Sequence, residues 1–209
     1  AGGNIVVTGS LVNGSNHTLD FGTYSLTGTG ATITNSSTLQ SAGAVTLSSG
    51  ASIGSTFVFN AATSTQTLPD ASFTNLTLSG GSGATGQKNF PSGTTSVSAT
   101  YSVAGANRSY GSGTFRYNGT NQNVLAESYN NLNLTGTGLG DVKTAAGNLS
   151  AGGTFSNLLG TTNMSTYTLS ITGAKTNTGK MQFAGLSNGL VFSDGTVEYN
   201  GSTSDAASQ

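Results

Sequence analysis

Charged side chains are the group that this sequence has least of. Asp, Glu, Lys and Arg make up 6% of its 209 residues, against roughly 25% in an average soluble domain, and the net charge is −1. The hydrophobic fraction is also low, at 34%, which is typical of disordered chains, but disorder normally comes with a high net charge. Alternating apolar residues recur throughout, as in residues 45–47 and 57–59. We therefore expect an ordered chain.

The scarcity of basic residues limits the partners that can be expected. Nucleic acids and anionic membrane surfaces are bound through clustered Lys and Arg, and the chain has only 6 of them. The absence of cysteine excludes disulfides and thiolate metal sites. No apolar run approaches the ~20 residues of a membrane helix. We expect no nucleic-acid partner and no membrane insertion.

Two segments of the chain are near-copies of each other. Residues 73–80 and 129–136 both read as an aromatic residue, two polar residues, a Leu-x-Leu alternation with a polar residue after it, and a glycine. This pattern predicts a short half-buried strand that ends in a turn. Each copy also follows an aromatic-Asn turn and a glutamine, which are Phe59-Asn60 with Gln66 and Tyr117-Asn118 with Gln122.

A longer repeat relates the two ends of the sequence. Residues 4–60 return as residues 148–200, and the offset drifts from about 144 to about 140, as small loop deletions between structurally equivalent strands would produce. The matched residues include Asn4 with Asn148, Asn13 with Asn157, Leu26 with Leu169, Asn35 with Asn177, and Phe59-Asn60 with Tyr199-Asn200. We therefore predict one repeat-built domain over residues 1–209.

The low charge has a physical reason if such repeats stack. Equivalent positions in successive β-coils lie about 4.8 Å apart, where two like charges repel by roughly 0.9 kcal/mol even in water. Uncharged Asn, Thr and Ser can instead hydrogen-bond from coil to coil. The sequence predicts an all-β fold, a right-handed parallel β-helix (β-solenoid). An antiparallel β-sandwich is the alternative, because short strands with regular turns also fit it.

The aromatic-Asn-Asn-Leu-x-Leu-x-Gly pattern of residues 129–136, preceded by an aromatic-Asn-Gly turn and Gln122, resembles the β-strand repeats of secreted bacterial surface proteins. The resemblance covers nearly the whole chain at the level of repeats and composition. It implies a β-solenoid, export, and residence at the cell surface or outside the cell. It implies no catalytic or binding residue.

Residues that could carry chemistry are sparse. A polysaccharide-cleaving β-helix would need clustered carboxylates, but the acids are scattered and form one tight pair, Asp194 and Glu198, across an expected turn. His17 is the single histidine and lies between expected strands, without metal-ligating neighbours in the sequence. We expect no enzyme, no cofactor and no metal site.

The ends of the expected solenoid suggest how it is used. Exposed strand edges invite pairing with another chain, and neither end shows a pattern for a capping helix. Either the chain is a segment of a longer solenoid, or subunits stack end to end through a non-closing contact that builds a fibre. The expected contact residues are Ile5, Val6 and Val7 at one end and Val197, Tyr199 and Asn200 at the other. The expected function is a structural subunit of an extracellular bacterial filament or surface layer, with the chain itself as partner; the alternative is an adhesin stalk or a module that binds cell-surface glycans.

Overall fold

The computed structural model describes residues 2–81, 85–184 and 190–200. The chain divides into two compact units, unit 1 (Ala1–Gly113) and unit 2 (Thr114–Gln209), and each is described by itself. Strands and turns make up both units, and no helix occurs among the described residues. That part of the chain accordingly offers no helix that could cross a membrane.

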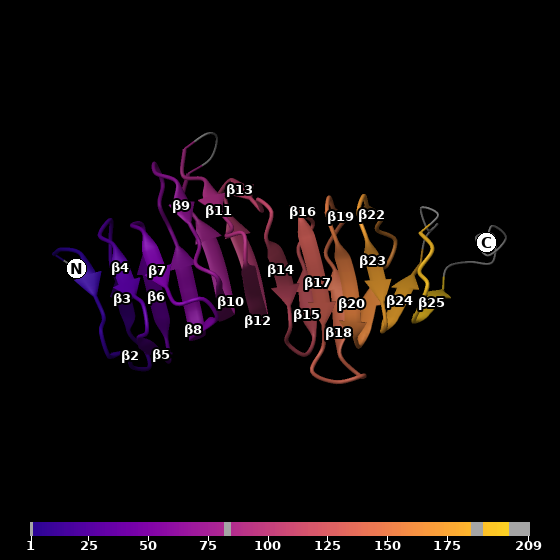
Figure 1. The fold of residues 1–209 in the computed structure, drawn as a ribbon, viewed down its shortest axis with the longest axis horizontal. Helices are drawn as coiled ribbons and strands as arrows, with labels where there is room; N and C mark the ends of the chain where they lie inside the picture. The colour runs from indigo at the N-terminus through magenta and orange to yellow at the C-terminus, as the bar shows by residue number, and fades with distance from the viewer. Residues whose placement is uncertain (1, 82–84, 185–189, 201–209) are drawn as a thin grey trace. The chain divides into compact units, whose positions relative to one another are not determined.

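Unit 1 consists of short strands on the sides of successive coils (Figure 1). Its strands group by hydrogen bonding as follows: β1 (Ile5–Val6), β4 (Leu26–Gly28) and β7 (Val45–Leu47); β2 (Ser10–Asn13) and β5 (Thr32–Asn35); β3 (Thr18–Asp20), β6 (Thr38–Ser41), β8 (Ala51–Phe59), β10 (Ala71–Ser79) and β12 (Thr94–Ala104); and β9 (Gln66–Thr67), β11 (Lys88–Asn89) and β13 (Arg108–Ser109).

Unit 2 repeats this construction. Its groups are β14 (Thr114–Tyr117), β17 (Asn131–Thr135), β20 (Phe155–Leu159) and β23 (Lys175–Asn177); β15 (Gln122–Val124), β18 (Val142–Ala145), β21 (Thr161–Asn163), β24 (Lys180–Phe183) and β25 (Thr196–Tyr199); and β16 (Ser128–Tyr129), β19 (Leu149–Ala151) and β22 (Leu169–Ile171).

Strand pairing runs from one coil to the next and is parallel. Ile5 pairs with Leu26, and Leu26 pairs with Val45, so the chain returns to the same side after about 20 residues, a usual repeat length for solenoids. The predicted parallel β-solenoid is therefore confirmed. The antiparallel sandwich is wrong, because consecutive strands turn a corner to the next side and each side is built from successive coils.

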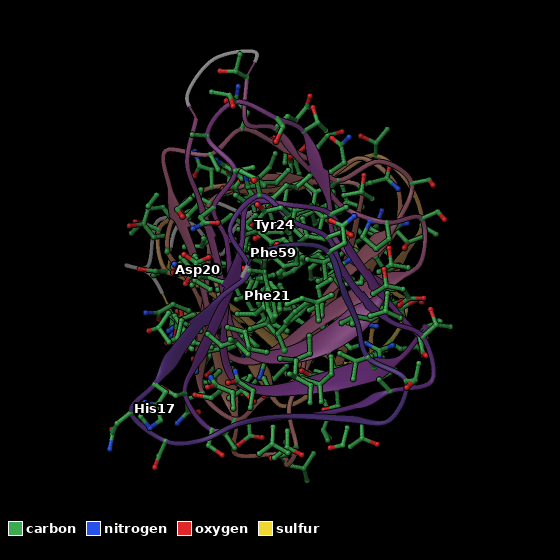
Figure 2. All side chains as sticks on the ribbon, turned by 90° about the vertical axis from the view of Figure 1, so that its left-hand side faces the viewer. His17, Asp20, Phe21, Tyr24 and Phe59 are labelled. Carbon is green, nitrogen blue, oxygen red and sulfur yellow. The ribbon has the colours of Figure 1, made fainter. Side chains whose placement is uncertain are left out.

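The apolar alternation fills the interior with columns of stacked side chains. In unit 1, Leu39, Phe57 and Leu76 are in register on neighbouring strands, and all are fully buried. In unit 2, Phe115, Leu132 and Phe155 form a similar buried column. Figure 2 shows the result along the coils of unit 1, where Phe21 and Phe59 lie inside the ring of strands and His17 lies at an outer corner.

A ladder of buried asparagines marks one corner in each unit. In unit 1, Asn13 Nδ2 donates to Asn35 Oδ1 (2.9 Å) and to the Thr38 carbonyl. In unit 2, Asn157 Nδ2 donates to Asn177 Oδ1 (2.7 Å) and to the Lys180 carbonyl. The residues paired by the long sequence repeat thus make the same hydrogen bonds.

The next step of this ladder shares one hydrogen bond between the two units. Asn35 Nδ2 donates to the Thr56 carbonyl and Asn177 Nδ2 to the Thr196 carbonyl. A glycine lies against the last asparagine of each ladder, where a Cβ on Gly54 or Gly195 would press against the carbonyl oxygen of Asn35 or Asn177. These equivalent hydrogen bonds show that β6 of unit 1 corresponds to β24 of unit 2, and that residues 56–59 of β8 correspond to β25.

Candidate functional site

Within the described residues, the strands of the first coil of unit 1 are paired on one side only: β1, β2 and β3 each pair with one neighbour, namely β4, β5 and β6. We call the unpaired side of such strands an open edge. In unit 2, β25 pairs with β24 alone within the described part of the chain. Backbone N–H and C=O groups along such edges are available to a further strand.

The inward-facing residues of these edge strands are less buried than those one coil further in. Ile5, Leu11 and Leu19 on the first coil are partly exposed, whereas their register partners Leu26, Ile33 and Leu39 are buried. In unit 2, Val197 and Tyr199 are partly exposed, although they lie over the buried Met181 and Phe183. Each edge therefore presents apolar surface that one more coil would cover.

The expected N-terminal contact residues differ in their orientation. The backbone N–H groups of Ile5 and Val7 donate to the carbonyls of Ser25 and Thr27, each at 2.8 Å, and thus hold the first coil to the second. Val6 is 68% exposed because alternation turns it outward, so it adds nothing to the inward columns. Leu11 and Leu19 are on the open edge as well and were not among the expected residues, although the alternation around Leu19 is visible in the sequence.

The expected C-terminal contact residues lie on or next to β25. The rings of Tyr199 and Phe183 stack, with centroids 5.8 Å apart, and the Asn200 N–H donates to the Phe183 carbonyl. The sequence pointed to Glu198 as one of a pair of carboxylates and not as a residue of this edge, where its side chain faces outward between Val197 and Tyr199. Glu198 forms an ion pair with Lys180 (2.5 Å) and accepts a hydrogen bond from Gln182, and these contacts hold the pKa of Glu198 below its usual range.

Asp194 and Glu198 do not act as a pair. Glu198 is bound by Lys180 and Gln182 on β24, while Asp194 accepts a hydrogen bond from Ser193 beside it. On the first coil, Asp20 accepts from the Gly22 N–H at 2.7 Å, and this bond, with a further one from Gln40, lowers the pKa of Asp20. These carboxylates are bound in turns and along strands rather than gathered around a reaction centre.

Two buried lysines occupy corresponding places in the two units. Lys88 lies next to Gln66, and Lys143 next to Gln122, on the neighbouring coil. Lys88 Nζ donates to the carbonyls of Ala61 and Gly86; Lys143 Nζ donates to those of Gly119 and Thr120. Burial lowers the pKa of both lysines.

The two glutamines complete these contacts on the same turns. Gln66 Oε1 accepts from the Ala61 N–H (2.9 Å), and Gln122 Oε1 accepts from the Gly119 N–H (2.7 Å). A glutamine and a lysine thus bind the N–H and the C=O of one turn residue from two successive coils. We call this arrangement the turn clamp; its contacts are satisfied by backbone, so it serves to join coils.

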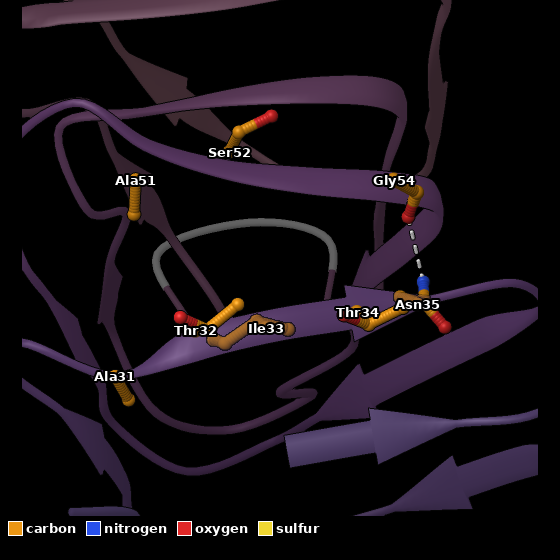
Figure 3. A pocket seen from close by; sticks show the side chains of 8 residues that line it. All are labelled: Ala31, Thr32, Ile33, Thr34, Asn35, Ala51, Ser52 and Gly54. Atoms are coloured by element: carbon orange, nitrogen blue, oxygen red, sulfur yellow. Dashed lines mark hydrogen bonds between the residues drawn. The ribbon is translucent and has the colours of Figure 1, made fainter. Parts of the chain in front are cut away.

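A shallow cavity of about 490 Å³ lies between β5 and β8 and is lined by Ala31–Asn35 together with Ala51, Ser52 and Gly54. Asn35 closes one end by donating to the Gly54 carbonyl at 2.8 Å (Figure 3). Its lining holds small, threonine and aliphatic side chains and no ionisable group. It offers nothing that would fix a charged ligand or move a proton.

The described residues contain no group of three or more His, Asp or Glu side chains that could hold a metal ion, and His17 is exposed on its loop. Among the described residues, the two edges are places where unpaired strand backbone adjoins partly exposed apolar side chains. No protein-family model, curated protein or solved structure matches this chain.

Proposed function

We propose that this protein is a structural subunit of an extracellular bacterial filament or surface layer and that it assembles end to end. The observation that carries the proposal is the loss of burial at the open edges. Leu19 and Val197 are partly exposed, while Leu39 and Met181, their partners one coil inward, are fully buried.

Physical chemistry favours another copy of the chain as the cover of these edges. A parallel strand laid on β3 or β25 gains backbone hydrogen bonds and buries apolar side chains, at about 25 cal/mol per Å² of apolar surface. The two edges are different surfaces, so joining one to the other is a heterologous contact that continues into a fibre. The near absence of charge leaves little repulsion between stacked copies.

The bacterial and extracellular parts of the proposal rest on the sequence pattern of residues 129–136. Its resemblance to the repeats of secreted bacterial surface proteins extends over most of the chain. The uncharged Asn-, Thr- and Ser-rich coils agree with that resemblance.

Complementary capping variants test the end-to-end contact. Leu19→Lys places a charge in the inward column of the first edge, and Val197→Lys does so at the other edge; each variant therefore keeps one intact edge. We expect the unaltered protein to sediment as long polymers, each variant alone to remain monomeric, and an equimolar mixture to form dimers through the intact edges. Electron microscopy of negatively stained samples provides the second measurement.

Thr100→Lys is the matched control, because Thr100 is exposed on β12, away from the open edges, and the variant adds the same charge there. Circular dichroism confirms that each variant is folded. The proposal is wrong if the folded, unaltered chain stays monomeric at high concentration, or if Thr100→Lys blocks assembly as strongly as the edge variants do.

A second candidate function, an adhesin stalk or glycan-binding module, is favoured by one outward surface of unit 1. Thr18, Thr38, Thr56, Asn75 and Thr100 are in register on adjacent strands. This column of hydroxyl and amide groups could hydrogen-bond a sugar chain laid along it. Saturable binding on a glycan array, lost in Thr38→Val with Thr56→Val, supports this function; an array without signal removes it.

A further inference from the structure

The carboxylates Asp20 and Glu198 lie on the open edges, on strands β3 and β25. The hydrogen bonds of the asparagine ladders show which positions of these two strands are equivalent. The asparagine ladders match β6 with β24 and residues 56–59 of β8 with β25. Strand β3 pairs with β6, so β3 belongs to the same side of its coil as β25 does.

The register of the columns follows from the pairings. Thr18, Thr38 and Thr56 form one outward column, which corresponds to Lys180 and Thr196 in unit 2. Asp20, Gln40 and Val58 form the next outward column, which corresponds to Gln182 and Glu198. Asp20 and Glu198 thus belong to the same column of the same side.

An end-to-end junction that continues this side lays β3 of one copy on β25 of another, as β10 lies on β8 within unit 1. The inward columns then match apolar with apolar, because Leu19 meets Val197 and Phe21 meets Tyr199. In the outward columns Thr18 meets Thr196. The remaining pair is Asp20 with Glu198, two carboxylates at the spacing of neighbouring strands, about 4.8 Å.

We infer that end-to-end assembly of this chain is promoted by acid, because the junction stacks Asp20 of one copy on Glu198 of the next. The inference rests on the proposed function and adds its regulation. Each edge belongs to a single unit, so the junction does not depend on how the two units of one chain are placed.

The other charged and polar groups near Asp20 and Glu198 do not cancel the repulsion between the two carboxylates. Asp20 is bound by Gly22 and Gln40, with a weak contribution from the α-amino group, and His17 and Tyr24 are the other titratable side chains of its coil. Glu198 is paired with Lys180 and Gln182 on β24, and Asp194 lies on the segment that leads into β25. Lys180 is one strand further from Asp20 than Glu198 is, so it reduces the repulsion without reversing it.

The sign of the effect follows from linkage. In the separate subunit both carboxylates have a lowered pKa and are ionised at neutral pH. In the junction, a neighbouring negative charge raises the pKa of the pair, so the assembled state binds more protons than the separate subunits do. Assembly therefore strengthens as the pH falls towards the carboxyl range near 4.

The test measures the critical concentration for assembly by sedimentation between about pH 7.5 and about pH 3, which spans the carboxyl range, at low ionic strength so that screening is weak. For the unaltered chain we expect it to fall by about two- to fourfold over this range, where fourfold is the full effect of two opposed charges in water. Asp20→Asn keeps an oxygen for the Gly22 N–H and should assemble at neutral pH as the unaltered chain does in acid.

Charge reversal gives a sharper result. Asp20→Lys faces Glu198 with an opposite charge, so this variant should assemble best at neutral pH and weaken in acid. Glu127→Gln is the matched control, because it removes one negative charge from a loop between β15 and β16, away from both edges, and should behave as the unaltered chain. Circular dichroism at each pH excludes unfolding as the cause.

The outcomes separate the two proposals. If no polymer forms in any variant at any pH at which the chain is folded, the end-to-end function itself is wrong. If polymers form but their critical concentration does not depend on pH, or if Asp20→Asn equals the unaltered chain at neutral pH, the function stands and the acid-promoted junction is overturned.

Discussion

Unit 1 and unit 2 contain the same turn clamp in different electrostatic surroundings. Lys88 and Lys143 each donate to backbone carbonyls of a turn in a neighbouring coil, and burial lowers the pKa of both. Asp141 opposes this shift for Lys143, while no carboxylate does so for Lys88. The comparison shows that the backbone geometry of the clamp, rather than a salt bridge, sets where a cation can be buried in this fold.

The asparagine ladders differ in the number of bonds they make, and this difference gives the largest expected effect. Asn35 Nδ2 lies within hydrogen-bond distance of the Ser37, Gly54 and Thr56 carbonyls, whereas Asn177 Nδ2 donates to the Thr196 carbonyl. Because unsatisfied buried polar groups cost about 1–3 kcal/mol each, we expect Asn35→Ala to lower the free energy of unfolding by about 2–4 kcal/mol and Asn177→Ala by about 1–2 kcal/mol.

Hydrogen exchange read separately in the two units measures these losses, because a two-unit chain need not unfold in one step. Asn123→Ala, at an exposed position on β15, is the control for loss of an asparagine outside the ladders. Equal losses for Asn35→Ala and Asn177→Ala would show that the extra bonds of Asn35 contribute nothing.

An intermediate effect is expected when each buried lysine is replaced by methionine. Loss of the buried cation stabilises the fold and loss of the carbonyl contacts destabilises it, so Lys88→Met and Lys143→Met should change the free energy of unfolding by within about 1 kcal/mol at neutral pH. The pH dependence is the clearer measurement. Because the lysine pKa is lower in the folded chain, the unfolded chain binds more protons below about pH 10, and stability rises with pH there.

Replacement by methionine should flatten this rise, and more so for Lys88, which has no opposing carboxylate, than for Lys143. Lys175→Met is the matched control, because Lys175 is exposed. Stability should be measured by denaturant titration below about pH 10, where ordinary tyrosines begin to ionise. Burial raises the pKa of Tyr117, so above that pH the unfolded chain loses this proton first and stability falls with pH instead of rising. An unchanged slope in Lys88→Met contradicts this account.

The smallest effect is expected at an exposed loop. Asp141 accepts hydrogen bonds from the Thr137 N–H and hydroxyl and the Gly138 N–H, and these lower its pKa. A carboxylate whose pKa is lowered on folding stabilises the fold at neutral pH and loses this contribution as the pH falls. Asp141→Asn should therefore lower the unfolding temperature slightly at pH 7 and leave it unchanged near pH 3; a loss that persists in acid would point to the side-chain shape instead of its charge.

The repeat pattern was sufficient to predict the coils and the parallel stacking, because alternation and turn residues are local signals. It also paired Asn13 with Asn157 and Asn35 with Asn177, whose hydrogen bonds are the same in the structure. The burial of Lys88 and Lys143 could not be predicted, because it depends on carbonyls of turns that lie more than 20 residues earlier. Of the expected contact residues, Ile5 and Val197 lie on the open edges; Leu19 and Glu198 lie there too and were not among the expected contacts.

The sequence alone determined that this chain forms uncharged, stacked β-coils, since period-two alternation, glycine and asparagine turns and the scarcity of ionisable residues each act within one coil. Only the tertiary structure decided which residues share a column, and therefore that Leu19 and Val197 lie on open edges and that Asp20 and Glu198 occupy equivalent places. The reason is physical: register between coils depends on corner contacts, such as the asparagine ladders, that join residues about 20 positions apart.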